Sequence, residues 1–317
     1  MNLTGYTRFN EVGFRNHILV LPTVFCSNKV CEMIADEVEE AIYINHAQGC
    51  GQIGSDLEQT KRTFIGTALN PNVYGVIIVG LGCEDAGAEE IANRIKSSTN
   101  KPVHVFSIQD YGDTEKAIKH GADIATNLVN DSKKLDRQPN GLEDIKIGFV
   151  NDSEKSLATY TIKKLLDKNA TLVLSNISDE PTDYLQEREG HLQSDIPTKT
   201  INYAENIHND EYGVFFMNSP SQVLEQITGI ASTGVHLIVA ITNEPFILGS
   251  PIVPVLNVCY DRQIYNDFSE DIDMYMDSES PSEILLENII KILSGKQTKG
   301  EIAEINDYGI QRIGPSI

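Results

Sequence analysis

A histidine and a cysteine lie four residues apart in the segment His46-Ala47-Gln48-Gly49-Cys50-Gly51-Gln52. Imidazole and thiolate groups bind zinc and iron, and glycine lets a backbone come close to a metal or a ligand. The segment follows an apolar run at 41–44 and precedes a helical pattern that begins near residue 55. Because α/β proteins bind ligands in loops between a strand and the next helix, we take this segment as the centre of a candidate site.

Two further cysteines lie at equivalent positions. Cys26 follows the apolar run at 17–22, and Cys83 follows the run at 73–82. Such runs, alternating with helical patterns, predict parallel strands whose carboxyl ends share one edge of the sheet. We therefore expect the loops that contain Cys26, Cys50 and Cys83 to converge.

The convergence suggests a metal site, with two alternatives. Thiolates with an imidazole suit zinc or iron, and three thiolates also suit an iron–sulfur cluster. The alternatives are reactive thiols without a metal, or cysteines that act as small buried hydrophobes. The spacing fits no standard zinc ribbon. Cys31 lies inside a predicted helix and Cys259 follows an apolar run, so packing is the expected role of both.

Three other polar residues belong to the candidate site. His46 is a candidate ligand or general base, and the alternative is a loop histidine that bonds to backbone groups. Glu84 and Asp110 follow predicted strands, where a carboxylate can bind a metal, act as a base or cap the next helix. Two further motifs give weaker support for a binding site. Gly80-Leu81-Gly82 lacks the lysine of a phosphate loop, and the acidic run at 270–277 is typical of a solvated surface.

The alternation of apolar runs and helical patterns predicts an α/β protein with two Rossmann-like domains, whose mostly parallel sheets are flanked by helices. We place the boundary in the turn-rich segment 137–141, which gives domains at 1–139 and 140–317. In the first domain, residues 1–15 are expected to be a lead-in arm, and strands are expected at 17–22, 41–44, 73–82 and 102–108. In the second, strands are expected at 145–150, 171–174, 214–217 and 236–241, a less regular extended run is expected at 253–258, and the stretch 176–211 is polar and irregular.

The composition limits the partners. The 317 residues have a formal net charge of −21, which argues against binding to nucleic acid or to anionic membranes. Neither a secretory signal nor an apolar run of about 20 residues is visible, so we expect a cytoplasmic protein. Five widely spread cysteines in such a chain indicate thiols or metal ligands rather than disulfides.

With these residues identified, the chain resembles the altronate/galactarate dehydratase family, in the large-subunit form found in sulfolactate sulfo-lyase. The resemblance spans about residues 4–139 and rests on segments that follow one another in family order: Gly5-Tyr6-Thr7-Arg8, 12–17, 21–27, 46–52, 72–84 and Ser107-Ile108-Gln109-Asp110. Weaker matches in the second half are 216–220, 228–234, 269–274 and 295–299. The small N-terminal domain of full-length dehydratases is expected to be absent.

The second half departs from the family pattern. Residues 150–153 replace a Cys-Gly-Gly-Ser-Asp segment, and a conserved arginine position carries Glu244. Asn257 and the pair Tyr260-Asp261 replace a lysine and a Thr-Asn pair. Since arginine binds carboxylates with two hydrogen bonds, a glutamate opposite the cysteine loops should repel an aldonate or aldarate.

The resemblance implies an iron-dependent lyase, of the dehydratase type, that acts on a small hydroxy acid with an altered substrate range. The alternative is a catalytically degenerate or regulatory paralogue that keeps the metal-site domain, and a thiol- or metal-sensing protein ranks below both. The assigned residues are His46, Gln48 and Asp110 for catalysis, and Cys26, His46, Cys50, Cys83 and Glu84 for mononuclear Fe²⁺ or an iron–sulfur cluster. The expected partners are the hydroxy acid, a separately encoded small subunit and further copies of this chain.

Overall fold

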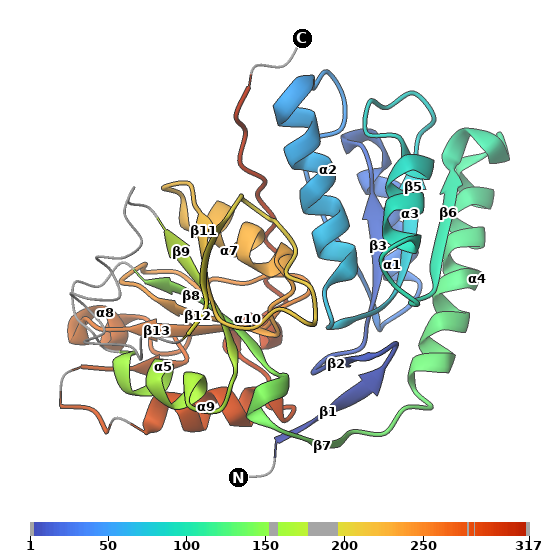
Figure 1. Cartoon of the computed structure of the whole chain (residues 1–317). Helices are drawn as coiled ribbons and strands as arrows, with labels where there is room; N and C mark the ends of the chain where they lie inside the picture. Colours follow the sequence, from blue (N-terminus) through green and yellow to red (C-terminus); the bar gives the residue numbers. More distant parts are fainter. Residues whose placement is uncertain (1–2, 152–157, 177–195, 278, 282, 315–317) are drawn as a thin grey trace.

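The computed structural model of the chain describes residues 3–151, 158–176, 196–277, 279–281 and 283–314. Two parallel sheets, each with helices on its faces, lie side by side, and a small antiparallel sheet lies beside them (Figure 1). This arrangement confirms the predicted α/β class. None of the helices in these ranges has the length and apolar content that a bilayer-spanning helix needs.

The first sheet has four parallel strands in the order β4-β3-β5-β6. Its strands are β3 (His17–Pro22), β4 (Ala41–Tyr43), β5 (Val73–Gly80) and β6 (Val103–Ser107), and its helices are α1 (Asn28–Asp36), α2 (Gly54–Leu69), α3 (Ala88–Lys96) and α4 (Thr114–Ser132). All eight residues of β5 are buried, because helices cover both faces of the sheet. Apolar side chains of α1 and α4 pack on one face, and those of α2 and α3 on the other.

The strand order sets the position of a ligand site. The chain passes from β3 to β4 on one side and then returns to place β5 on the other side of β3. In doubly wound sheets, such a reversal opens a crevice between the carboxyl ends of the two central strands. Cys26 follows β3 and Cys83 follows β5, so both flank this crevice.

The second sheet has seven parallel strands in the order β10-β11-β9-β8-β12-β13-β14. The strands are β8 (Lys146–Asn151), β9 (Thr171–Asn176), β10 (Thr198–Ile201), β11 (Val214–Asn218), β12 (Leu237–Ile241), β13 (Val255–Cys259) and β14 (Met274–Tyr275). The helices are α5 (Thr159–Leu166), α7 (Val223–Ser232), α8 (Arg262–Asp267), α9 (Ile284–Leu293) and α10 (Lys299–Ile302). The four strands predicted from apolar runs are confirmed, and the extended run at 253–258 contains strand β13. Strands β10 and β14 were missed, because both are short and β10 is largely exposed.

The prediction of an irregular arm at residues 1–15 is wrong. Strands β1 (Leu3–Arg8) and β2 (Glu11–Gly13) form a hairpin, and β1 also pairs with β7 (Gln138–Asn140). The hairpin turn has positive φ at Phe9 and Asn10, as a two-residue turn between twisted strands requires. Without glycine at either turn position, the sequence lacked the usual hairpin signal. Residues 177–195 of the polar stretch lie outside the described residues, and strand β10 lies in the rest of that stretch.

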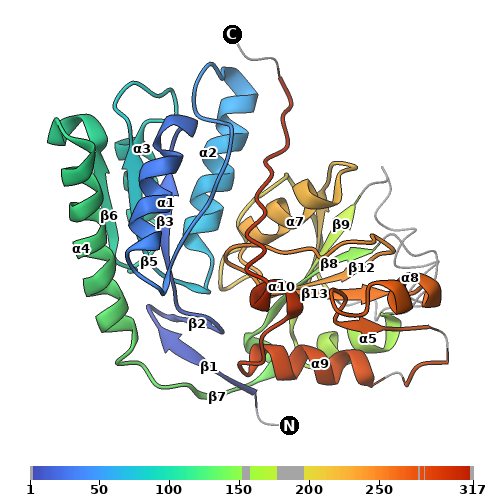
Figure 2. The same cartoon turned by 180° about the vertical axis from the view of Figure 1, so that it is seen from behind.

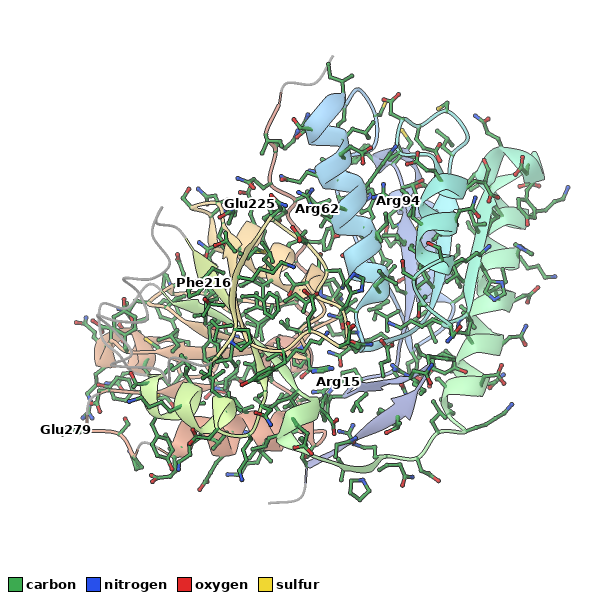
Figure 3. All side chains as sticks on the ribbon, in the orientation of Figure 1. Arg15, Arg62, Arg94, Phe216, Glu225 and Glu279 are labelled. Carbon is green, nitrogen blue, oxygen red and sulfur yellow. The ribbon has the colours of Figure 1, made fainter. Side chains whose placement is uncertain are left out.

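The amino ends of the two parallel sheets meet at a buried joint. Asn72, just before β5, is fully buried and donates from Nδ2 to the carbonyl oxygens of His236 (3.0 Å) and Ile252 (3.2 Å) in the second half. Its Oδ1 accepts from the backbone N–H groups of Phe14 (3.0 Å) and Arg15 (3.3 Å). Arg15 lies in this region between the two sheets (Figure 3). One side chain therefore connects the hairpin, the first sheet and the second sheet.

Because both sheets begin at the joint, their carboxyl ends lead away from it. Figures 1 and 2 show the strands of the first sheet running from the joint along α2. Helices α2 and α7 pack against each other beside the joint, where a Cβ at Gly66 would lie 2.2 Å from the Ser232 carbonyl oxygen. Glycine is therefore required at this crossing.

Candidate functional site

Four loops at the carboxyl edge of the first sheet are joined by hydrogen bonds. The loop after β3 meets the His46 loop where Phe25 N donates to Gln48 O (3.0 Å). The His46 loop meets the Cys83 loop where Asp85 N donates to Gly49 O (3.1 Å). The last two loops meet at Leu81, whose carbonyl oxygen accepts from Ser107 Oγ (2.7 Å) and from the backbone N–H of Gln109 (3.4 Å). The structure thus brings together the four segments that the sequence placed at one edge.

The three cysteines of these loops have exposed side chains. Cys26, Cys50 and Cys83 are free thiols, whereas Cys31 and Cys259 are buried. Cys31 lies in the apolar layer between α1 and the sheet, as predicted. Within the described ranges, no three His, Cys, Asp or Glu side chains are arranged as a metal-binding group. We name the edge formed by residues 22–27, 45–53, 81–87 and 107–113 the cysteine edge.

His46 is buried, and both of its ring nitrogens bond to backbone groups. Nε2 donates to the carbonyl oxygen of Pro22 (2.9 Å), so the proton lies on Nε2, and Nδ1 accepts from the N–H of Gln48 (3.1 Å). Burial lowers the pKa of His46 to about 4, against the opposing effect of the Pro22 carbonyl. In this arrangement His46 offers no free nitrogen to a metal or to a substrate proton. These bonds favour the alternative of a histidine that fixes the loop, and the roles of ligand and base stay a prediction.

Gln48 and Gln52 hold the rest of the loop. Gln48 Oε1 accepts from the N–H of Ala47 (2.9 Å), and Gln52 Oε1 accepts from the N–H of Gly49 (2.9 Å). Gly49 has a φ of 97° and approaches Thr23 so closely that a Cβ would lie 2.1 Å from its carbonyl oxygen. Gln48, assigned to catalysis from sequence, is thus a buried side chain with a contact that shapes the loop. The sequence did not indicate that Gln52 holds the loop through the backbone at Gly49.

Glu84 bonds across the crevice rather than to a helix. Its Oε1 accepts from Thr23 Oγ1 (3.1 Å) and its Oε2 accepts from the N–H of Gly82 (2.7 Å). Helix α3 begins four residues later, at Ala88, so the alternative of helix capping is wrong for this residue. The carboxylate is half-buried and lies between the loops after β3 and β5. It retains lone pairs that could face a metal.

Asp110 is an exposed carboxylate in the short helix η2 (Ile108–Tyr111). It does not cap the following helix, because Asp113 does so by accepting from the N–H of Glu115 (2.9 Å). Within the described residues, no hydrogen bond to the Asp110 carboxylate is found. Of the three residues assigned to catalysis, Asp110 is the one whose polar group is not used for packing.

The altered residues of the second half belong to the second sheet. Glu244 follows β12 at the carboxyl end of that sheet, whereas the cysteine loops follow strands of the first sheet. The position of Glu244 opposite the cysteine loops stays a prediction. Asn257 is buried and bonds to both backbone groups of Leu248 (2.9 and 3.1 Å). In the acidic run, Asp273 is not a solvated residue, since it accepts from the backbone of Asn257 and Lys299.

Sequence reasoning missed the C-terminal segment. Residues 308–313 run from α7 along α2 and reach the cysteine edge (Figures 1 and 2). Ile313 N donates to Asp56 Oδ1 (2.9 Å) and Arg312 Nη2 lies 3.1 Å from Asp56 Oδ2. Burial alone would raise the pKa of Asp56, but these contacts and a hydrogen bond from Gln52 lower it below its usual value. The isolated tail has no periodic pattern from which this contact could be predicted.

Comparison with known proteins identifies a family. The profile for the second domain of D-galactarate dehydratase/altronate hydrolase matches residues 5–133, and the C-terminal profile of D-galactarate/altronate dehydratase matches residues 192–316. The two matches follow the order expected within one family.

Full-length relatives agree with these profiles. The (2R)-sulfolactate sulfo-lyase subunit beta of Chromohalobacter salexigens is 26% identical, across 98% of this chain and 97% of its own length. The altronate dehydratase of Escherichia coli is 27% identical across 54% of this chain, and that of Bacillus subtilis is 26% identical across 52%. These matches span only 36% and 35% of the two dehydratases.

Proposed function

Since the chain belongs to the D-galactarate/altronate dehydratase family, we propose that it is an iron-dependent lyase of the dehydratase type that acts on a small hydroxy acid. The observation that carries the proposal is the position of three exposed thiols on linked loops at the carboxyl edge of the first sheet, two of them beside its central crevice. Ligands of doubly wound proteins bind in this crevice. A chain-long similarity to a sulfo-lyase subunit supports the class of reaction.

The exposed thiols, rather than the buried histidine, are the ligands that we propose for iron, although no three His, Cys, Asp or Glu side chains of the described residues are arranged as a metal-binding group. Cys26, Cys50 and Cys83 are exposed on linked loops, and thiolates are ligands for iron and for iron–sulfur clusters. Glu84 lies between two of these loops and adds an oxygen donor. We therefore assign the iron, as mononuclear Fe²⁺ or a cluster, to these residues, with His46 shaping the loop. When bound, iron acts as a Lewis acid toward the oxygens of the hydroxy acid.

The proton chemistry falls to the exposed carboxylate. Removal of water or sulfite from a 2-hydroxy acid requires a base for the proton beside the carboxylate and an acid for the leaving group. Asp110 is available as the base, since its carboxylate is exposed and no bond within the described residues holds it. Gln48 and Gln52 position the loop that presents Cys50, through bonds to the backbone at Ala47 and Gly49.

A second subunit is part of the proposal. The relative from Chromohalobacter salexigens is named as a subunit beta, and it matches this chain over almost its whole length. We propose that this chain also acts with a separately encoded small subunit, in a cytoplasmic assembly with further copies of itself.

A second candidate function rests on the second half of the chain. Where the family pattern has an arginine and a lysine, this chain has Glu244 and Asn257, and Asn257 is used to hold the backbone at Leu248. These changes favour a paralogue that keeps the fold and the metal site but has lost turnover, with a regulatory role.

Metal analysis tests the iron site. The full chain is purified without oxygen, and iron and acid-labile sulfide are measured per chain. Cys50→Ser should lose most of the iron, whereas Cys31→Ala, which alters a buried thiol in α1, should keep it. Iron content that is equal in wild type and Cys50→Ser would remove Cys50 from the site.

Activity analysis separates the two candidate functions. The wild-type chain is assayed with added ferrous iron against a panel of hydroxy acids, alone and together with the product of any neighbouring reading frame of small-subunit size. Release of water or sulfite that needs iron and falls at least 100-fold in Asp110→Asn supports the lyase. Iron binding without turnover of any acid would favour the paralogue, and a protein that binds no iron would contradict both.

A further inference from the structure

The C-terminal segment is the part of the second half that reaches the cysteine edge. Ile310 O accepts from Gln48 Nε2 (3.5 Å), and Gln311 O accepts from Gln59 Nε2 (2.8 Å) on α2. In Figures 1 and 2, this segment leaves the second sheet and runs beside α2 toward the loops that precede that helix. Residues of the tail are therefore candidates for contact with a substrate at this edge.

Arg312 is held beside the Cys50 loop by a buried carboxylate. Its Nη2 lies 3.1 Å from Asp56 Oδ2 and 3.5 Å from Gly314 O, and about a third of its side chain is exposed. The same Asp56 oxygen accepts from Gln52 Nε2 (2.7 Å). Because Gln52 also bonds to the backbone at Gly49, the guanidinium and the Cys50 loop are fixed by one hydrogen-bond network.

The cysteine edge needs a cation from elsewhere if an acid is to bind there. Its four loops contain no lysine or arginine, and they contain Glu84, Asp85, Asp110 and Asp113. The nearby Lys29 is already paired with Glu32 (2.7 Å). An anion approaching this edge therefore meets negative charge on a chain whose net charge is −21.

Arginine is suited to binding an acid group, and Arg312 has N–H groups that its contacts do not use. A guanidinium binds a carboxylate or a sulfonate through two parallel N–H groups. Within the described residues, Arg312 bonds only through Nη2, so its Nε and Nη1 N–H groups are not used by hydrogen bonds there. Asp56 therefore holds the guanidinium through Nη2, and about a third of the side chain is exposed.

Resting on the proposed function, we infer that Arg312 binds the acid group of the substrate at the cysteine edge, with Asp56 as its positioning residue. The inference adds to the proposed function the residue that binds the carboxylate or sulfonate of the acid. It also explains how an anion could be bound although the second sheet carries Glu244 where the family pattern has arginine. The positive charge that binds the acid is then that of Arg312, in the C-terminal segment.

Binding of charged and neutral probes tests this role. The full chain, loaded with ferrous iron without oxygen, is titrated with (2R)-sulfolactate, altronate and galactarate, and then with the neutral carboxamide of the acid that binds best. Arg312→Gln should raise the dissociation constant of the acid about 10- to 100-fold, because a charge-assisted hydrogen bond is lost. It should change that of the carboxamide less than twofold, and Arg312→Lys should recover part of the affinity.

Arg94→Gln is the matched control, because Arg94 is an exposed arginine on α3 with carboxylate partners on the surface (Figure 3). The affinity of the Arg94→Gln variant for the acid should stay within twofold of the wild-type affinity. If Arg312→Gln binds the acid as well as wild type does, the inference is wrong and the proposed function stands. Equal weakening of acid and carboxamide would show a purely structural role, which also overturns the inference. If wild type binds none of the acids, the hydroxy-acid function is wrong and the inference fails with it.

Discussion

The buried joint and the cysteine edge lie at opposite ends of the first sheet, and both collect polar side chains. At the joint, these side chains are used for backbone hydrogen bonds: Lys101 Nζ donates to the carbonyl oxygens of Leu69 (2.8 Å) and Asn70 (2.6 Å), and Lys146 Nζ donates to Ile207 O (2.8 Å). At the cysteine edge, three thiols and the carboxylate of Asp110 remain exposed. Polar groups that are not used for structure therefore mark the end of the sheet that is available for chemistry.

The two regions also contain histidines in the same bonding arrangement. At the joint, His236 Nδ1 accepts from the N–H of Lys146 (2.8 Å) and Nε2 donates to Val12 O (2.9 Å). At the edge, His46 bonds to Gln48 and Pro22 in the same way. Each ring connects two backbone segments in its neutral form. A histidine beside a cysteine is thus not by itself a metal ligand, because its nitrogens can already be used.

The largest effect is expected at Asn72, whose side chain makes four backbone contacts across the joint. Asn72→Ala should lower the free energy of unfolding by about 4 kcal/mol, because four buried backbone groups lose a partner. Urea denaturation measures the change. Asn93→Ala, on the exposed face of α3, is the control and should stay within about 0.5 kcal/mol of wild type. A loss below about 1 kcal/mol for Asn72→Ala would contradict the role of this joint.

A smaller effect is expected where α2 crosses α7. Gly66→Ala would place a methyl group 2.2 Å from the Ser232 carbonyl oxygen, so the helices must separate. We expect a loss of about 2–3 kcal/mol, in the range of overpacked cores. Gly87→Ala is the control, since the nearest atom to its Cβ would be Glu90 Cβ, at 4.0 Å. Equal melting temperatures for the two variants would show that the halves do not pack this closely.

The sequence predicted the fold where continuous apolar runs mark buried strands. Strand β5 and its four-strand sheet follow from apolar runs, and the parallel order then places the cysteine loops together. What could not be predicted depends on contacts between distant segments. The hairpin at residues 3–13, the use of both His46 nitrogens and the contact between Arg312 and Asp56 leave no local pattern, because each is set by packing across the joint or along α2.

Low pH should destabilise the folded chain, because each of the two regions contains a buried histidine. Burial, together with the charge of Lys146, lowers the pKa of His236 to about 3, and burial lowers that of His46 to about 4. Below pH 6.5 the unfolded chain therefore binds protons that the folded chain does not, and stability falls as the pH drops from 6.5 toward 4. Between pH 7 and 5.5, each histidine should cost about 1.4 kcal/mol of unfolding free energy.

Glutamine variants separate the two contributions, and urea denaturation at pH 7 and 5.5 measures them. His46→Gln and His236→Gln should each reduce the difference between the two pH values by about 1.4 kcal/mol. His120→Gln, on the exposed surface of α4, is the control. A variant with the same pH dependence as wild type would mean that its histidine is not buried in neutral form.

The smallest effect on stability is expected where the chemistry is proposed. Cys26, Cys50 and Cys83 are exposed, so changing all three to serine should alter the unfolding free energy of the metal-free chain by less than about 1 kcal/mol. The same change at Cys31 buries a hydroxyl in an apolar layer and should cost about 1–3 kcal/mol. Urea denaturation with a chelator present measures both. A loss above about 2 kcal/mol in the triple variant would mean that these thiols pack like those of the core. A stable triple variant that no longer binds iron would instead show that the edge keeps its cysteines for chemistry.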